Sequence, residues 1–345
     1  MSENTGRIDY ESTEKDVKID LKDKRILSLL SDDARTPLTQ IAKKVQLSRD
    51  SVDYRIKRLQ EKGVILKFFP NLNYDKLGYY IFHVFLLIDE LDKKEQNNLI
   101  KTLKEHDNIF SVIEYSDRWD LEIVLIAENL LVFDKIISDI AGQFPNLILE
   151  KDKLEIIRRY NSSYLPPLLR EKGHEKEAII HHRVPTAKVD DIDIKILSIL
   201  SEDCRISTYK IGATLGLSAD TINYRIKNLL KEEVIKNFTI LVNLSILKYS
   251  WYTFSVEMKM FNYENEKKFE SFLDKNHNII RSVKTLGGWD LLLYVVVENP
   301  REFHHIVKDL KNTFANIVRN YQTWVAYKEH IFKTMPAIIK KYKQE

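Results

Sequence analysis

Hydroxyl and cationic side chains gather on one short stretch of the chain, from Leu47 to Leu59. At about 100° per residue, Val52, Ile56 and Leu59 fall within a narrow arc of a helix, and the polar side chains lie beside or opposite that arc. Such a helix can pack by its apolar side and present the other side to the phosphates and base edges of DNA. An ordinary helical bundle with a solvated basic face would show the same pattern.

The predicted DNA contacts in this region share an exposed position on the helix or on the strand that follows it. They are Ser48, Arg49, Ser51, Tyr54, Arg55, Lys57, Arg58 and Lys67. Ser51, Tyr54 and Arg58 are expected nearest the base edges, and the other cations nearest the phosphates. Arg55 could instead brace the domain against the preceding helix, and Tyr54 could pack against protein.

The flanking residues predict where this helix begins and ends. Ser48 is a good N-cap, and Gly63 is a suitable C-terminal stop before a β-branched and aromatic strand over 64–69. Upstream, a helix is expected over about 21–30, and Thr36-Pro37 should open a second helix as its cap and first residue. Two helices joined by a tight turn, the later one basic and followed by a strand, are typical of a winged helix-turn-helix.

Composition excludes several classes of protein. The 345 residues are 44% apolar and 30% charged, as in ordinary globular proteins, and the net charge is only +3. Any affinity for nucleic acid must therefore come from local charge, and residues 48–67 alone carry a net charge of +3. The single cysteine, Cys204, rules out an internal disulfide. No apolar run is long enough to span a bilayer, and residues 1–18 are not signal-like, so a cytoplasmic setting is expected.

The chain repeats itself with an offset of 170 residues. Residues 19–65 and 189–235 share 20 identities in 47 positions, whereas about three would be expected by chance from average composition. The register continues without a gap, since Trp119-Asp120 returns as Trp289-Asp290 and Pro166 as Pro336. We name residues 19–166 the first repeat and residues 188–336 the second repeat. The charged stretch 167–187 is predicted to be a linker.

Each repeat continues with a second predicted domain. In the first repeat strands are expected over 79–89, 108–115, 119–126 and 147–158, with helices over 93–105 and 131–144. This β-α-β-β-α-β order predicts a ferredoxin-like sandwich in the α+β class. The expected divisions are a polar tail 1–18, winged domains 19–74 and 188–244, ferredoxin-like domains 75–166 and 245–336, and a basic tail 337–345.

These features together resemble the Lrp/AsnC (feast/famine) family of prokaryotic transcriptional regulators. The resemblance includes the first-helix pattern Asp-x-x-Ile-Leu-x-x-Leu with a following Arg, found at 23–30 with Arg35 and at 193–200 with Arg205. It implies that the ferredoxin-like domains pair and sense small molecules, often amino acids. Tandem copies on one chain suggest an archaeal variant. The two repeats could pair as the subunits of a dimer do, with further homo-oligomers left open.

The family commonly carries Gly-x-aromatic-Asp between the second and third strands of its sensing domain. The second repeat has Gly287, Gly288 and Asp290 in this pattern, whereas the first repeat has Asp117 in place of the glycine and keeps Asp120. Glycine permits a positive φ and the close approach of another group to the backbone. The resemblance therefore implies an effector site at Gly287, Gly288, Asp290 and Asp120, with its first-repeat half in question. The alternative is that Trp289-Asp290 simply folds a hairpin.

The second winged domain departs from the first in its charge. Residues 218–237 carry a net charge of +1, because Ala219 replaces Arg49 and Asn228 replaces Arg58. Its predicted DNA contacts are Ser218, Thr221, Tyr224, Arg225, Lys227 and Asn228. One chain should thus present two unequal domains to half-sites about one helical turn or a multiple apart, and the operator should be asymmetric.

Two other classes stay open. Siroheme decarboxylases are similar in build, which suggests an enzyme, and the pairs His181-His182 and His304-His305 are its nearest candidate residues. Neither pair has metal-ligand spacing or a nucleophile-base arrangement, so no catalytic residue, metal or cofactor is predicted. The third class is an architectural or ligand-binding protein with vestigial winged domains. The cationic face at 48–67 favours the regulator.

Overall fold

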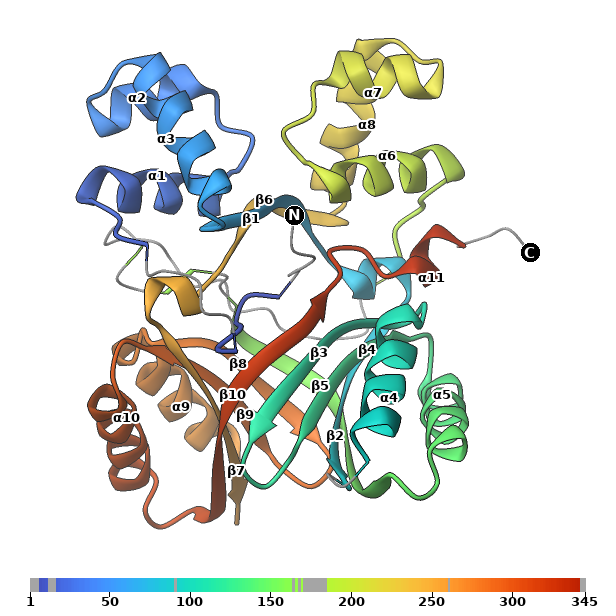
Figure 1. The fold of residues 1–345 in the computed structure, drawn as a ribbon, viewed down its shortest axis with the longest axis vertical. Helices are drawn as coiled ribbons and strands as arrows, with labels where there is room; N and C mark the ends of the chain where they lie inside the picture. The colour runs from blue at the N-terminus through green and yellow to red at the C-terminus, as the bar shows by residue number, and fades with distance from the viewer. Residues whose placement is uncertain are drawn as a thin grey trace.

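Two small helical heads stand side by side above a single β-barrel (Figure 1). This computed structural model describes residues 6–11, 17–89, 92–162, 165–166, 169, 185–259 and 261–341. The first head has α1 (Leu21–Asp32), α2 (Leu38–Val45), α3 (Arg49–Glu61), β1 (Ile65–Leu72) and the 3₁₀ turn η1 (Tyr74–Leu77). The second has α6 (Asp191–Glu202), α7 (Thr208–Leu215), α8 (Ala219–Lys231), β6 (Ile235–Val242) and η3 (Ser245–Leu247).

The helix ends follow local chemistry, with one difference from the sequence prediction. Ser48 caps α3 by accepting a hydrogen bond from the backbone N–H of Ser51, as predicted. Gly63, just past α3, has φ +69°, which glycine adopts freely. Pro37, however, is the N-cap of α2 and not its first residue, and no side chain caps that helix. The fixed φ of proline holds the entry, so the Thr36 hydroxyl is not needed as a cap.

The ferredoxin-like order occurs twice, as predicted. The first repeat has β2 (Tyr80–Ile88), α4 (Lys93–Glu105), β3 (Ile109–Ser116), β4 (Leu121–Ala127), α5 (Leu130–Gln143) and β5 (Ile148–Ser162). The second has β7 (Ser250–Met258), α9 (Tyr263–Lys275), β8 (Ile279–Leu286), β9 (Leu291–Val297), α10 (Pro300–Thr313) and β10 (Val318–Phe332), with α11 (Ala337–Lys340) after it.

The two sheets merge into one closed barrel of order β10-β3-β4-β2-β5-β8-β9-β7. This closure depends on β5 and β10, each 15 residues long. The first part of β5 pairs with β2, and its last part pairs with β8 of the other repeat. In the same way β10 pairs with β7 and then with β3. The closed sheet leaves no free edge strand, and α4 and α5 cover one side while α9 and α10 cover the other (Figure 1).

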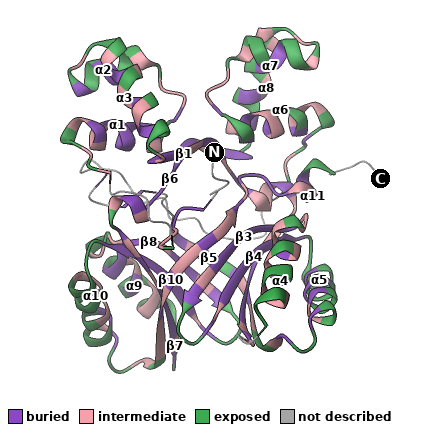
Figure 2. Ribbon diagram, in the orientation of Figure 1, coloured by how far each residue is buried: buried purple, intermediate pink, exposed green. Residues whose placement is uncertain are grey.

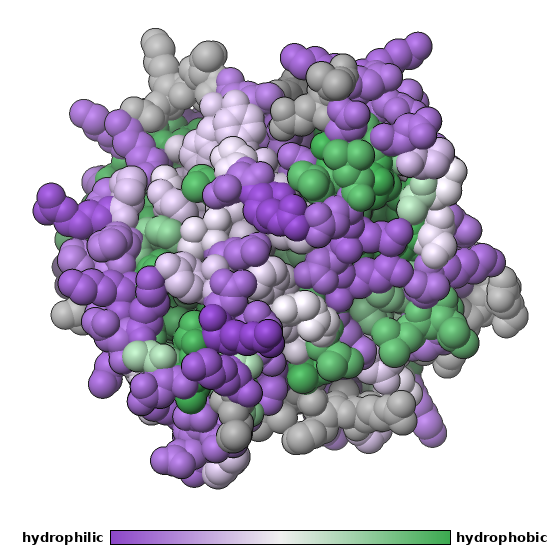
Figure 3. Space-filling model, turned by 90° about the horizontal axis from the view of Figure 1, so that it is seen from below, coloured by the Kyte–Doolittle hydropathy of each residue, from purple (hydrophilic) through white to green (hydrophobic). Residues whose placement is uncertain are grey.

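Burial follows this layout (Figure 2). One apolar cluster runs from both heads through β1 and β6 into the barrel, and separate clusters lie under α4 and α5 and under α9 and α10. The repeats pack alike here, because Phe82 stacks on Phe133 at 4.2 Å and Tyr252 stacks on Phe303 at 4.0 Å. Seen from below, the barrel end away from the heads is covered mainly by hydrophilic residues with apolar patches between them (Figure 3).

An antiparallel ribbon of β1 and β6 joins the two heads. Each head also contacts the other head's strand, since the backbone N–H of Ala34 donates to Phe238 and that of Cys204 donates to Phe68. Arg35 donates to the carbonyl oxygens of Cys204 and Ile206 at 2.5 and 3.1 Å, and Arg205 makes the reciprocal contact with Ala34. Burial raises the pKa of the Cys204 thiol to about 12, as befits a core residue. The relative position of the heads is therefore set by direct contacts.

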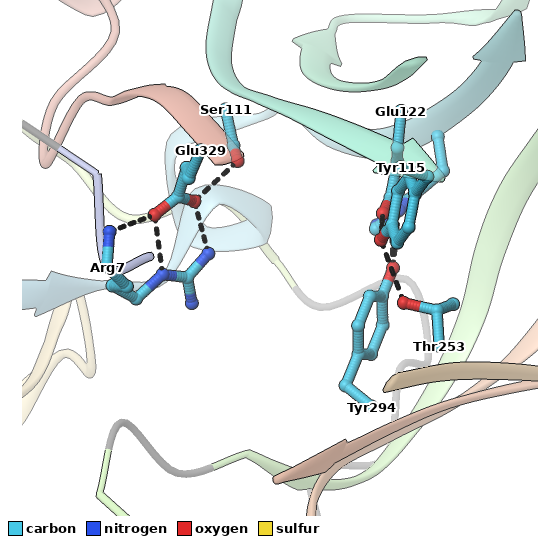
Figure 4. Close-up of polar contacts among 8 residues, drawn as sticks. Arg7, Ser111, Tyr115, Glu122, Thr253, Tyr294 and Glu329 are labelled. Carbon is cyan, nitrogen blue, oxygen red and sulfur yellow. Dashed lines mark hydrogen bonds and ion pairs between the residues drawn. The ribbon is translucent and has the colours of Figure 1, made fainter. Parts of the chain in front are cut away.

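The first residues of the chain are not simply a polar tail. Ile8 is fully buried, and the Arg7 guanidinium pairs with Glu329 of β10 at 2.5 Å (Figure 4). The backbone N–H of Leu244 also donates to the carbonyl oxygen of Arg7 at 2.6 Å. A buried arginine requires a carboxylate partner, and β10 supplies one, so this segment ties the barrel to the end of β6.

The far end of the chain makes a similar connection. Thr334, just after β10, donates from its hydroxyl to the carbonyl oxygen of Ser201 in α6 at 2.8 Å. The predicted basic tail begins with the short helix α11, and residues 342–345 lie outside the described part, as does most of the predicted linker. Within the described residues, no helix is both long and apolar enough to cross a membrane.

Candidate nucleic-acid interface

The outer face of α3 is open to solvent at the predicted contacts. Tyr54 is 67% exposed, which excludes its packing against the rest of the chain. The Arg49 side chain is 64% exposed beside Asp50, and Lys57 is 65% exposed while pairing with Asp53 one turn earlier. Ser48 and Ser51 link their hydroxyl groups at 2.8 Å at the start of the helix.

The outer face of α8 repeats this arrangement with fewer charges. Tyr224 is 71% exposed, and Lys227 and Asn228 are exposed beside it. Ser218 caps the helix by accepting from the backbone N–H of Thr221, whose side chain is half-buried. The two helices thus present the same tyrosine and lysine positions, while Arg49 has no cationic counterpart in α8.

Two predicted contact residues of α3 are instead directed to α1. Arg55 pairs with Asp20 at 2.7 Å and with Asp23 at 2.8 Å, and Arg58 pairs with Asp23 at 2.5 Å. The Asp23 side chain is 1% exposed, so it needs a cationic partner inside the head. This corrects the expected placement of Arg58 on the outer face and supports the bracing alternative for Arg55.

The corresponding brace in the second head has one arginine. Arg225 pairs with Asp190 and Asp193, each at 2.9 Å, and the Asp193 side chain is 14% exposed. In both heads these aspartates also form the capping box of the first helix. The arginine retained in both repeats therefore fixes α3 against the start of α1, and α8 against the start of α6.

Lys67 does not share the surface of α3. It lies on β1 and approaches Glu202 of α6 at 3.3 Å, with 30% of its side chain exposed. Lys67, which was expected to contact a phosphate, thus lies between the ribbon and the second head, because β1 crosses to that head.

The sequence did not lead us to the exposed polar residues on α2 and α7, the helices that come before α3 and α8. Lys43 and Lys44 are exposed in the last turn of α2, and Tyr209 and Lys210 are exposed in α7, with Tyr209 at 75%. The available signal was the helical period of α2 and α7, whose apolar positions fall on the opposite side. These residues extend the polar surface beyond α3 and α8.

The glycine turn expected to hold an effector is filled by protein. A Cβ on Gly287, which has φ +149°, would lie 2.5 Å from both the Lys153 carbonyl oxygen and the Leu154 side chain. A Cβ on Gly288 would lie 2.7 Å from the Asp152 carboxylate. These glycines therefore permit the close approach of β5 from the other repeat. The group that approaches the backbone at this turn is protein, whereas the sequence prediction was a ligand.

The two aspartates of the same turns fold the strands. Asp290 accepts from the backbone N–H of Met258 at 2.6 Å, and Asp120 accepts from that of Ile88 at 2.6 Å. Each carboxylate thus ties its turn to the end of a neighbouring strand, β7 for Asp290 and β2 for Asp120, which favours a structural role for both. Asp120 also lines a surface hollow of about 850 Å³ beside α4, together with Glu114, Lys328 and other residues.

A buried polar network inside the barrel was also missed. The Glu122 carboxylate is fully buried and accepts a hydrogen bond from His83 Nδ1 at 2.5 Å. It also accepts from the Tyr115 hydroxyl at 2.5 Å and from the Tyr294 hydroxyl (Figure 4). Burial opposes its ionisation, but these hydrogen bonds outweigh burial and hold the pKa of Glu122 below its ordinary value. The sequence does contain a sign of this network. Glu122 lies on an otherwise apolar strand, and the corresponding residue of the second repeat is Leu292.

The heads and the barrel define a tandem pair of winged helix-turn-helix units carried on ferredoxin-like domains. Residues 19–65 match the winged helix-turn-helix DNA-binding family, and residues 189–230 match the AsnC-type helix-turn-helix domain. The chain is 35% identical to the transcriptional regulator LrpA of Pyrococcus horikoshii over 144 residues, which are 39% of this chain and 99% of that protein. It is 31% identical to the regulator FL11 of Pyrococcus furiosus over 143 residues, 41% of this chain and 91% of that one.

The chain belongs to the Lrp/AsnC family of DNA-binding transcriptional regulators. Each of these relatives has about the length of one repeat, so this chain combines two such units. The structure of the siroheme decarboxylase NirDL has the same overall build, with a TM-score of 0.62 over 93% of this chain and 98% of that one. The two share 12% of their residues, and this likeness concerns the fold alone.

Proposed function

We propose that this chain is a sequence-specific regulator in which a single polypeptide carries the two DNA-binding domains that a dimer of one-repeat subunits would supply. The observation that carries the proposal is the pair of heads held side by side by the β1–β6 ribbon, each with an exposed tyrosine and lysine on α3 or α8. Winged domains bind DNA through such a helix in the major groove, and paired domains bind paired half-sites. Tyr54 and Tyr224 are the proposed base contacts, and Arg49 and Lys57 the proposed phosphate contacts.

The proposed operator is asymmetric, with the first head binding more tightly. Its outer face carries Arg49, and Lys43 and Lys44 lie on α2, whereas the second head has Ala219 at the position of Arg49. Each phosphate contact strengthens binding and steepens its dependence on salt. We therefore expect loss of the first head's outer cations to cost more than loss of the second head's.

Matched substitutions in the two heads test this proposal. Binding sites are first selected from a random DNA library, and the affinity is then measured by fluorescence anisotropy at two salt concentrations. Tyr54→Ala with Lys57→Ala should weaken binding more than Tyr224→Ala with Lys227→Ala, and each lost phosphate contact should lower the salt slope by about 1. Lys94→Ala, which removes an exposed cation from the first turn of α4, serves as the control. If neither head pair affects the affinity, the proposal fails.

We also propose that the barrel responds to a small molecule of the amino acid class and that the chain is not an enzyme. LrpA and FL11 are both named as regulators, which supports this choice. His304 and His305 of the enzyme alternative are exposed on α10, and His181-His182 lie outside the described residues. The absorption spectrum of an added iron porphyrin should stay that of the free compound. A stoichiometric spectral shift would favour the decarboxylase alternative.

A further inference from the structure

The second turn of α8 carries an exposed asparagine, Asn223. Within the described part of the chain, its carboxamide has no hydrogen-bonding partner. Ala219 lies one turn before it and Lys227 one turn after it, on the same side of the helix. Tyr224, the proposed base contact of this head, is the next residue along the chain. The position before this tyrosine therefore offers both a hydrogen-bond donor and an acceptor to whatever binds the helix.

The corresponding position of α3 has a different chemistry. Asp53 takes the place of Asn223, and its carboxylate pairs with the Lys57 ammonium at 2.7 Å. The Asp53 side chain is 38% exposed, and Arg49 lies one turn before it. An ionised carboxylate only accepts hydrogen bonds, and the phosphates that flank a DNA groove repel it. This part of α3 therefore carries charge, whereas the same part of α8 carries a neutral amide.

We propose that Asn223 is a specificity-determining residue that reads an adenine in the half-site bound by the second head. Adenine presents the N7 acceptor and the N6 amino donor in the major groove, and an asparagine carboxamide can bond to both at once. Residues near the start of a recognition helix contact the base edges, and Asn223 is the fifth residue of α8. The inference rests on the proposed function, because it requires α8 to enter the groove.

The two heads then contribute differently to one operator. The first head brings the outer cations of α2 and α3, and contacts to phosphates carry no direct information about base sequence. The second head has Ala219 at the position of Arg49 and a carboxamide at Asn223 in place of an acid. Its share of the binding free energy therefore depends more on the base pair that it meets. We expect the half-site of the second head to be the more strictly defined, although the first head binds more tightly.

Affinities for altered operators test this assignment. Sites are selected from a random DNA library with the full chain, each base pair is then replaced in turn, and binding is measured by fluorescence anisotropy. For the unaltered chain, replacing the A·T pair read by Asn223 should weaken binding roughly 5- to 150-fold, the range for one bidentate base contact. Asn223→Ala should lose that preference and keep the salt slope, because it removes no phosphate contact.

Two further measurements assign the preference to this residue. Footprints of the variant that combines Tyr224→Ala with Lys227→Ala show which half-site belongs to the second head, because protection is lost there. Asn98→Ala, which removes an exposed amide from α4, is the control and should keep the preference for adenine. Thermal melting reports whether each variant folds. Should Asn223→Ala fail to fold, Asn223→Asp provides the same test, because a carboxylate cannot donate to adenine N7.

A matched change in the first head tests the same chemistry as a gain of function. Asp53→Asn should create a preference for adenine at the corresponding position of the first half-site. Asp53→Ala removes the same charge without supplying a carboxamide, so it should create no such preference.

A preference that persists in Asn223→Ala, or a second half-site selected without adenine, would overturn the assignment and leave the proposed function standing. The proposed function itself fails if the unaltered chain selects no operator, or if the tyrosine and lysine variants of both heads keep full affinity. The two failures are therefore distinguishable in one set of titrations.

Discussion

The two repeats differ less in how they are built than in what their surfaces and interiors carry. Both heads keep the serine cap, the capping box and the arginine brace, and both barrel halves keep the hairpin aspartate. The differences lie in Arg49 and Arg58, which become Ala219 and Asn228, and in the buried Glu122, which becomes Leu292. Duplication has thus kept the helix caps, the arginine brace and the turn aspartates, and has changed several charged side chains and the glycines at two turns. The following predictions test that division.

The largest difference is expected at the buried aspartate of each head. Asp23 neutralises two arginines, whereas Asp193 is paired with one and is more exposed. Removing a buried partner leaves cations uncompensated, although the arginines are partly solvated and the cost is reduced accordingly. We expect Asp23→Ala to lower the free energy of unfolding by about 2–3 kcal/mol and Asp193→Ala by about 1 kcal/mol.

Chemical denaturation with hydrogen exchange resolved along the chain measures this difference. Exchange should accelerate in α1 and α3 for Asp23→Ala and in α6 and α8 for Asp193→Ala. Both residues belong to capping boxes, so the loss of the cap is common to both variants and cancels in the comparison. Equal costs in the two heads would contradict the role of the second arginine.

A second difference is expected at the turns that approach the neighbouring repeat. Gly287→Ala would place a methyl group 2.5 Å from Lys153 and Leu154, which must move. Forcing atoms into a packed site costs roughly 1–3 kcal/mol. The matching change in the first repeat, Asp117→Ala, has no positive φ to accommodate and should cost less than about 0.5 kcal/mol. Thermal unfolding of the two variants measures the difference in stability. A Gly287→Ala variant as stable as the unaltered chain would count against close packing between this turn and β5.

A smaller difference is expected where the helices α3 and α8 stop. Gly63 follows α3 with φ +69°, and Glu233 occupies the same place after α8 with φ +57°. A side chain in this region is strained, so Glu233→Gly should stabilise the second head by about 1 kcal/mol, while Gly63→Ala should destabilise the first by a similar amount. Hydrogen exchange in α8 and α3 reports each change locally. A destabilising Glu233→Gly would show that the glutamate makes contacts that outweigh the strain.

Local patterns in the sequence were enough to predict most of the elements. The helix over 93–105 agrees with α4 to the residue, and the cap at Ser48 follows from residue type alone. The family resemblance also implied that the two ferredoxin-like domains could pair. Periodicity could not predict that β5 and β10 cross between the halves, because strand partners are distant in sequence.

The site was predicted less well, for two physical reasons. An arginine on the polar side of a helix has the same spacing whether it faces solvent or a neighbouring carboxylate, so Arg58 was placed on the wrong surface. A glycine signals close approach but not the identity of what approaches, and Gly287 meets β5 in place of a ligand. The buried Glu122 and the inserted Arg7 depend on pairing across the barrel, which the sequence does not display.

The smallest expected effect concerns acid sensitivity, which should belong to the first repeat's half of the barrel. Burial lowers the pKa of His83 despite its hydrogen bond from Nδ1 to Glu122, and Arg281 and Arg159 lower it further. The unfolded chain therefore takes up a proton more readily than the folded chain, and stability falls as the pH drops through about 6.5, the ordinary value for histidine. The lowered pKa of Glu122 acts in the same direction at lower pH, because its contribution is lost as the pH falls through the folded value.

In the second repeat Thr253 takes the place of His83 and cannot titrate in this range. We expect the melting temperature to fall by ~2–4 °C between pH 7.5 and 5.5, and His83→Gln to reduce that fall. His304→Gln on the exposed surface of α10 is the control and should not change it. An unchanged pH dependence in His83→Gln would place the acid sensitivity outside the buried network, and the functional asymmetry of the repeats would then be confined to their heads.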